Sequence, residues 1–190
     1  MTDALHERLN KILPRVTSDE FITGRGLGNE VAFHIFDYPP ERELEVRGFI
    51  PTLLEHLPIK RPGICVKSID LFDFVLDHLQ ERGLLEKALR LQREKGDDAL
   101  TKALSGPLEE GKLRAPFAQV ADPAHNDLVL LSGVGTGWPL VRVHSLLNNL
   151  HPVMGRTPLV VFYPGSYDGL SLRLFGKFRA NYYRAFKLIP

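Results

Sequence analysis

The sequence predicts an α/β fold in which helices flank a mainly parallel sheet of four strands. Four short runs rich in β-branched and aromatic residues alternate with stretches of helical periodicity, which is typical of consecutive βαβ units. Each run is almost continuously apolar, as expected when both faces of a sheet are buried. The length of 190 residues suits a single domain. We therefore expect one domain over residues 1–190, with an N-terminal helical extension at 1–30 and a strand with an aromatic, basic tail at 158–190.

The predicted strands are defined by their β-branched and aromatic residues and by the breakers that follow them. The first strand ends before the pair Pro39 and Pro40, and the third runs into a glycine-rich loop. Both features interrupt regular structure. The four strands cover residues 31–38, 64–69, 127–132 and 158–163.

The segments between the strands carry apolar residues at helical spacing. Helices are predicted at 4–13, 16–22, 41–57, 71–82, 84–104 and 139–150, with a short one at 170–175. Pro51 is expected to kink or interrupt the helical region in which it lies. Glycine and proline punctuate residues 107–116, which predicts a linker, and residues 182–188 fit either a helix or an extended segment.

Composition and charge exclude several classes of protein. The formal net charge is +1, so nothing attracts the whole chain to nucleic acid or to an anionic membrane. The N-terminus has no apolar leader, and no apolar run approaches the ~20 residues of a spanning helix; a cytoplasmic protein without a membrane partner is expected. The single cysteine, Cys65, excludes an internal disulfide, and its apolar neighbours predict burial. The histidines match no metal motif, so we expect neither a metal nor a cofactor.

A glycine loop follows the third predicted strand and contains Gly133, Gly135 and Gly137. In a parallel sheet this position belongs to the carboxyl edge, where ligands usually bind. A P-loop needs lysine and then serine or threonine after its last glycine, but Trp138 and Pro139 stand there. The dinucleotide fingerprint fails as well. The sequence thus predicts a Rossmann-like fold without an intact P-loop, and a tight strand–helix turn is favoured over a nucleotide or phosphate site.

Polar side chains near the same edge form a weak ligand-binding hypothesis with the glycine loop. Arg142 and His144 follow the loop, and Asp37 ends the first strand. Together they could bind a ligand or act as acid and base. In the favoured interpretation, Arg142 pairs with an acid such as Asp37 and His144 simply packs. Asp37 and Asp70 could hold Mg²⁺ or a ribose hydroxyl, but helix N-caps are the favoured interpretation, above all for Asp70.

The C-terminal region concentrates aromatic and basic residues, which are enriched at protein interfaces. We expect it to provide a docking surface, with the turn at Pro164–Gly169 as a shaped loop. Direct contact with DNA through the basic tail is an alternative, although it is not expected from the tail alone. The candidate partner-binding residues are Tyr163, Tyr167, Asp168, Arg173, Phe175, Tyr182, Tyr183, Arg184 and Phe186.

Four segments of the sequence carry a resemblance to a known family. They are FHIFDYPPERELEVR (33–47), GVGTGWPLVRVHSLLN (133–148), FYPGSYDGLSLRLF (162–175) and NYYRAF (181–186). Together they resemble the BrxB family of BREX bacteriophage-exclusion systems, over effectively the whole chain. The family offers no established catalytic residue to carry over.

The resemblance implies a small component of a multiprotein defence system that also contains a large ATPase, an alkaline-phosphatase-like protein and a DNA methyltransferase. We therefore expect a non-enzymatic adaptor that bridges other BREX proteins, foremost the phosphatase-like protein and the ATPase. The alternatives are a degenerate nucleotide-binding regulatory subunit that uses the glycine loop and a subunit that contacts DNA.

Overall fold

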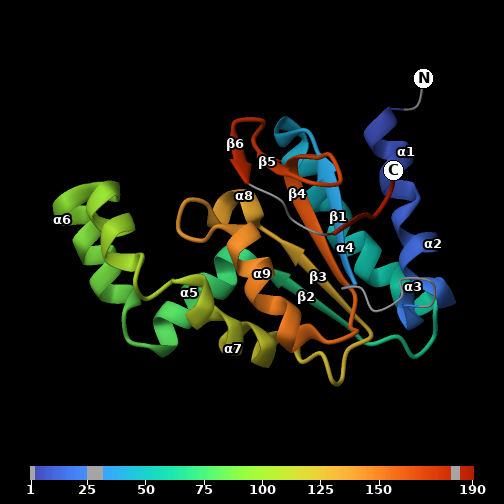
Figure 1. The fold of residues 1–190 in the computed structure, drawn as a ribbon, viewed down its shortest axis with the longest axis horizontal. Coiled ribbons are helices and arrows are strands. Elements are labelled where there is room, and N and C mark those ends of the chain that lie inside the picture. Colours follow the sequence, from blue (N-terminus) through green and yellow to red (C-terminus); the bar gives the residue numbers. More distant parts are fainter. Residues whose placement is uncertain (1–2, 25–31, 181–184) are drawn as a thin grey trace.

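The structure is a computed structural model that describes residues 3–24, 32–180 and 185–190. Its centre is a sheet in which five parallel strands lie in the order β2-β3-β4-β1-β7 (Figure 1). The strands are β1 (Phe33–Tyr38), β2 (Val66–Asp70), β3 (Leu128–Ser132), β4 (Leu159–Tyr167) and β7 (Phe186–Lys187). The predicted α/β class and all four predicted strands are confirmed, and β7 is an additional strand.

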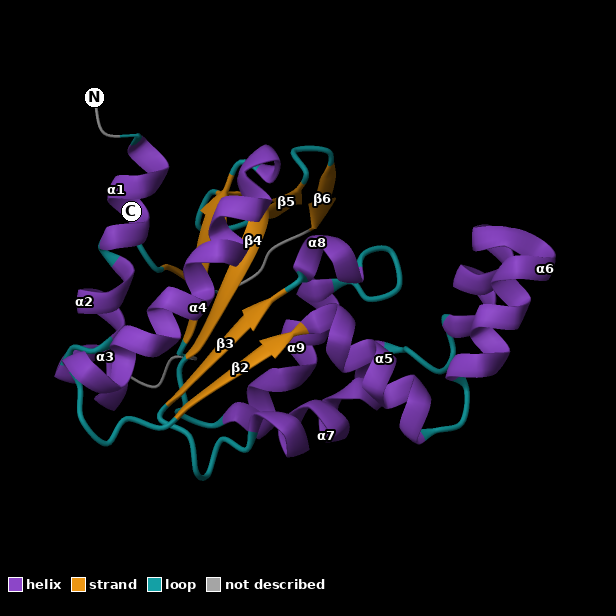
Figure 2. Ribbon diagram, turned by 180° about the vertical axis from the view of Figure 1, so that it is seen from behind, coloured by secondary structure: helices purple, strands orange, loops and turns teal. Residues whose placement is uncertain are grey.

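One face of the sheet is covered by the N-terminal helices and by α4 (Figure 2). Their apolar residues meet those of β1, β3 and β4 that point to this face, among them Phe36, Leu130 and Phe162. The helices are α1 (Ala4–Asn10), α2 (Ile12–Val16), α3 (Asp19–Thr23) and α4 (Glu43–Lys60), with the 3-10 turn η1 (Pro40–Arg42) before α4. Helix α4 continues through Pro51, which is exposed, so the expected interruption does not occur. The buried apolar side chains of α4 hold the helix on the sheet.

The opposite face is covered by helices from the middle of the chain, and α6 extends to the side (Figure 1). These helices are α5 (Leu71–Glu81), α6 (Leu85–Leu104), α7 (Glu110–Ala121), α8 (Val134–Gly137) and α9 (Val143–Met154). The linker predicted at 107–116 is wrong because α7 occupies most of it. Leu113, Phe117 and Ala121 are buried at four-residue spacing, and this helical stripe outweighs the glycine and proline that suggested a break.

The C-terminal region differs most from its prediction. Strand β4 continues to Tyr167, so the expected loop at Pro164–Gly169 is mainly strand. The short helix expected at 170–175 is wrong, because β5 (Leu172–Leu174) pairs antiparallel with β4 and with β6 (Phe178–Ala180). The end of the chain then adds β7 to β1. Removal of residues 170–190 would therefore delete strands of the sheet.

Candidate functional site

The glycine loop is packed against the protein's own side chains. Gly133 has φ +69°, and a Cβ there would lie 2.2 Å from Asp70 Oδ1; a Cβ on Gly135 would press on Phe175, and one on Gly137 on Leu71. Since only glycine permits these close approaches, the geometry fits the tight-turn interpretation. The nucleotide-binding alternative stays a prediction.

The polar residues predicted beside this loop do not all come together. Asp37 accepts hydrogen bonds from Arg8 (2.8 Å) and from the Tyr167 N–H (3.0 Å), so the expected pairing with Arg142 is wrong. Arg142 is exposed. His144 is half-buried with Nε2 3.2 Å from Ser145 Oγ, and burial lowers the pKa of its imidazole.

Asp70 fulfils its predicted role as a helix cap. Its Oδ1 accepts hydrogen bonds from the N–H groups of Phe72 (2.9 Å) and Asp73 (3.3 Å) at the start of α5. These bonds satisfy two of the N–H groups that a helix leaves free at its first turn.

The predicted partner-binding residues divide into buried, structural and exposed positions. Tyr163 and Tyr167 are only 2% and 1% exposed, so they are corrected to core residues that cannot meet a partner at the surface. Asp168 closes the turn before β5, and its hydrogen bonds with Ser171 and Leu170 lower its pKa to about 2. Phe175 is half-buried against Trp138.

Two other members of the set are available at the surface to different degrees. Arg173 is exposed, whereas Phe186 is half-buried and its ring lies 5.7 Å from that of His34. Tyr182, Tyr183 and Arg184 lie outside the described residues. The docking role of the tail, and its alternative role in DNA contact, stay predictions.

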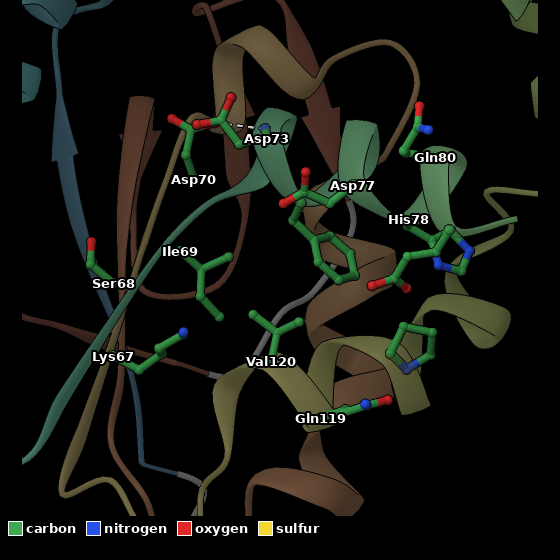
Figure 3. A pocket seen from close by; sticks show the side chains of 13 residues that line it. Lys67, Ser68, Ile69, Asp70, Asp73, Asp77, His78, Gln80, Gln119 and Val120 are labelled. Carbon is green, nitrogen blue, oxygen red and sulfur yellow. Dashed lines mark hydrogen bonds between the residues drawn. The ribbon is translucent and has the colours of Figure 1, made fainter. Parts of the chain in front are cut away.

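A groove of about 580 Å³ lies elsewhere, beside β2 and between α5 and α7 (Figure 3). Four consecutive residues of β2, 67–70, line it. Because successive side chains of a strand point to opposite faces, a cavity lined by all four runs along the edge of the strand. The remaining lining residues are Asp73, Phe74, Asp77, His78, Gln80, Glu81, Pro116, Gln119 and Val120.

Within the described part of the chain, the edge of β2 that borders this groove has no neighbouring strand, since β2 stands last in the strand order and pairs with β3. Its residues are mostly half-buried, whereas those of β3 are almost all buried. Cys65, just before β2, is exposed. Its predicted burial is wrong because the segment lies at the margin of the sheet and not inside it.

The wall that α5 contributes is acidic. Asp73, Asp77 and Glu81 are exposed and one helical turn apart, which places them on one side of α5. None of the three forms an ion pair with another described residue. With Asp70, four carboxylates face the groove against the single ammonium group of Lys67.

His78 of α5 also lines this groove. The residue is only 8% exposed, and its Nε2 has no hydrogen-bond partner among the described residues. Burial lowers the pKa of the imidazole, which favours the neutral form at neutral pH. A neutral imidazole nitrogen can donate or accept a hydrogen bond, but Nε2 itself is buried from solvent.

Sequence reasoning missed this groove, although two signals pointed to it. The four-residue spacing of Asp73, Asp77 and Glu81 marks an acidic helical side, and the polar pair Lys67 and Ser68 makes β2 less apolar than the other predicted strands. Neither signal shows that β2 ends the sheet, because strand order is a tertiary property. Across the described ranges, no group of three or more histidine, cysteine or acidic residues is arranged to hold a metal, and no helix is both long and apolar enough to cross a bilayer.

Fold and groove define a helix-flanked parallel-sheet protein with one open, acidic sheet edge. The family model for BREX protein BrxB matches residues 67–188. A BREX protein BrxB of Escherichia coli O9:H4 (strain HS) is 43% identical over 187 residues, which cover 98% of this chain and 92% of the relative. Another, of Bacillus cereus (strain H3081.97), is 41% identical over 188 residues and covers 97% of each chain. The chain therefore belongs to the BrxB family, as the resemblance indicated, and has a role in BREX phage defence. No solved structure matches it.

Proposed function

We propose that this chain is a non-enzymatic adaptor of its BREX system, which holds larger members of the system together by protein–protein contacts. The observation that carries the proposal is the groove along the free edge of β2, whose wall of carboxylates lacks ion-pair partners among the described residues. An exposed strand edge is a template for pairing with another chain, and proteins usually protect it.

The packing at the carboxyl edge of the sheet also supports a non-enzymatic role. In many α/β enzymes this edge holds the substrate. Here Phe175 and Leu71 lie against the glycines of the loop, and Asp37 is bound to Arg8. The protein's own side chains thus fill positions where a ligand would approach.

Membership of the family supports partners within the same system. The two partners proposed are the alkaline-phosphatase-like protein and the large ATPase. The localisation proposed is the cytoplasm, where these partners and phage DNA would meet.

Affinity purification from cells that carry the intact BREX system tests the adaptor function. The full chain bears the tag, and cells with the tag alone are the control. We expect the phosphatase-like protein, the ATPase or both to be enriched over the control. If no other BREX protein is enriched over the control, the proposal is contradicted.

The non-enzymatic part of the proposal needs a separate test. Arg142 and His144 are the two side chains near the carboxyl edge best suited to acid–base or anion chemistry. We expect Arg142→Ala and His144→Ala to leave phage plating efficiency as low as in the unmodified system. A rise in plating with normal folding and normal partner retention would indicate chemistry at this edge.

A further inference from the structure

We propose that the groove receives an extended, basic segment of a partner protein, which pairs with the free edge of β2 as an additional strand. The inference rests on the adaptor function proposed above and specifies how one partner docks. Strand addition of this kind takes its affinity from backbone hydrogen bonds and its specificity from alternate side chains.

The hydrogen bonds of the sheet identify the backbone groups that are free to pair. The Leu128 N–H donates to the Cys65 C=O (3.3 Å), whereas the Val129 N–H donates to the Pro158 C=O (2.9 Å) on the side of β4. In a parallel strand, the direction of these groups alternates from residue to residue. Cys65, Lys67 and Ile69 therefore face β3, and the N–H and C=O groups of Val66 and Ser68 point away from it.

No described part of the chain occupies that side of β2. The sheet order ends at β2, and the contacts of α5 and α7 leave a groove beside residues 67–70. A strand placed there would lie at the usual spacing of about 4.8 Å from β2. It would offer hydrogen-bond partners to the outward N–H and C=O groups of Val66 and Ser68.

The acidic charge of the groove favours a partner segment that contains lysine or arginine. Asp73, Asp77 and Glu81 form one acidic wall and lack ion-pair partners among the described residues. Lysine or arginine at alternate positions of the added strand would place positive charges on that side. Such complementary charges raise the association rate and disfavour acidic competitors.

Two further side chains supply contacts that an extended peptide can use. Val120 of α7 lines the groove and is an exposed apolar residue, which suits an aliphatic side chain. His78 of α5 lines the same groove and adds a ring surface against which a side chain of the segment can pack. Figure 3 shows these residues on the walls around the edge of β2.

A synthetic strand peptide of about nine residues, alternating lysine and valine, tests the inference without requiring a known partner. The purified full chain is titrated against the labelled peptide, and fluorescence anisotropy reports binding. We expect saturable binding that is at least about tenfold tighter than that of the same peptide with glutamate in place of lysine. Equal binding of the two peptides, or no binding of either, would overturn the inference.

Variants of the chain distinguish the contribution of backbone pairing to peptide binding from the contribution of the acidic side chains. Ser68→Pro removes one outward N–H and adds a ring at the edge, a position where proline is compatible with a strand. The triple variant Asp73→Lys, Asp77→Lys and Glu81→Lys reverses the acidic wall. We expect each to weaken binding of the lysine peptide by at least about tenfold. A matched control is Glu86→Lys, Glu94→Lys and Asp98→Lys on α6, which makes the same charge change at exposed positions and is expected to bind as the unmodified chain does.

The same variants distinguish this inference from the adaptor function when they are used in affinity purification. Loss of a BREX partner in the triple variant, with retention in the α6 control, supports both. Retention of every partner by both groove variants overturns the docking mode, while the adaptor function stands. If Ser68→Pro alone is poorly folded, the triple variant decides, because its changes lie on an exposed helix surface.

Discussion

The two edges of the central sheet differ in whether another segment of the chain pairs with the long strand there. At one edge, β7 pairs with β1, and the Leu188 N–H donates to the Ile35 C=O (2.9 Å). Asp37 of β1 also forms ion pairs with Arg8 of α1 and, at 3.7 Å, with Lys187 of β7. At the other edge, β2 has β3 as its single neighbouring strand among the described residues, and a groove lies along its other side.

This difference indicates that the β2 edge is the surface on which a partner protein binds in our proposal. The chain uses its own C-terminus to cover one edge, which lowers the risk of unwanted pairing there. Leu188 and Ile189 are buried in the same cluster as the N-terminal helices, so this end of the chain is structural. We therefore expect changes at the β7 edge to affect stability and changes at the β2 edge to affect binding.

The largest loss of stability is expected from Asp37→Ala. Its side chain is only 12% exposed, and the substitution removes the acceptor of Arg8 and of the buried Tyr167 N–H. Removing one partner from such a pair leaves the other unsatisfied. The free energy of unfolding, measured with urea, should fall by about 3 kcal/mol. The control Asp73→Ala at the open edge should change it by less than about 0.5 kcal/mol; equal effects would remove the contrast between the edges.

A pH-dependent loss of stability is expected from His34 of β1, whose ring centroid lies 4.5 Å from that of Phe21 and 5.7 Å from that of Phe186. It is 1% exposed and has no hydrogen-bond partner among the described residues, and burial lowers the pKa of its imidazole to about 4. The unfolded chain takes up this proton near pH 6.5, so stability is present above that pH and declines as pH falls toward 4. The expected loss from pH 7 to pH 5 is about 2 kcal/mol.

The variant His34→Leu isolates that contribution from the other histidines. Urea unfolding of both proteins at pH 7, 6 and 5 gives the comparison. We expect the variant to lose about 2 kcal/mol less than the unmodified chain over this range. Parallel curves would show that His34 does not titrate in this way.

A smaller effect is expected from Tyr167→Phe. The buried hydroxyl donates to the Ala185 C=O (2.8 Å) and accepts from the Ala185 N–H (3.1 Å), next to β7. Loss of these bonds should lower the free energy of unfolding by about 1–2 kcal/mol. Thermal unfolding provides the measurement. A neutral substitution would mean that water replaces the hydroxyl and that the β7 edge is less tightly closed than proposed.

The smallest effect on stability is expected from the triple reversal of Asp73, Asp77 and Glu81. The three carboxylates are exposed and lack ion-pair partners within the described ranges, so their loss should change the free energy of unfolding by less than about 0.5 kcal/mol per site. A clear destabilisation in urea, absent from the α6 control variant, would assign these residues a structural role and weaken the interpretation of the open edge.

Local patterns predicted much of the fold. Continuous apolar runs located all four long parallel strands, and the position of Asp70 before an apolar helix predicted its role as a cap. Helix α7 was missed because Gly111 and Pro116 lie inside it. Strand β7 was missed because two residues form no periodic pattern, and its pairing with β1 depends on residues far apart in the sequence.

The candidate site was less predictable for a physical reason. Sequence spacing shows which side chains share an element, but not which strand ends the sheet. Asp37 and Arg142 were both assigned to the carboxyl edge, yet Asp37 forms its ion pairs with residues from opposite ends of the chain. The groove arises where β2, α5 and α7 meet, and that arrangement depends on the order of the strands.

Hydrogen exchange of the complex retained in affinity purification tests the central claim most directly. The amides of Val66 and Ser68 are compared in the isolated chain and in the complex. If a partner adds a strand to β2, both amides should exchange at least about tenfold more slowly in the complex, while the Leu188 amide at the closed edge stays unchanged. Unchanged exchange at Val66 and Ser68 in a complex that is fully formed would contradict docking at the open edge.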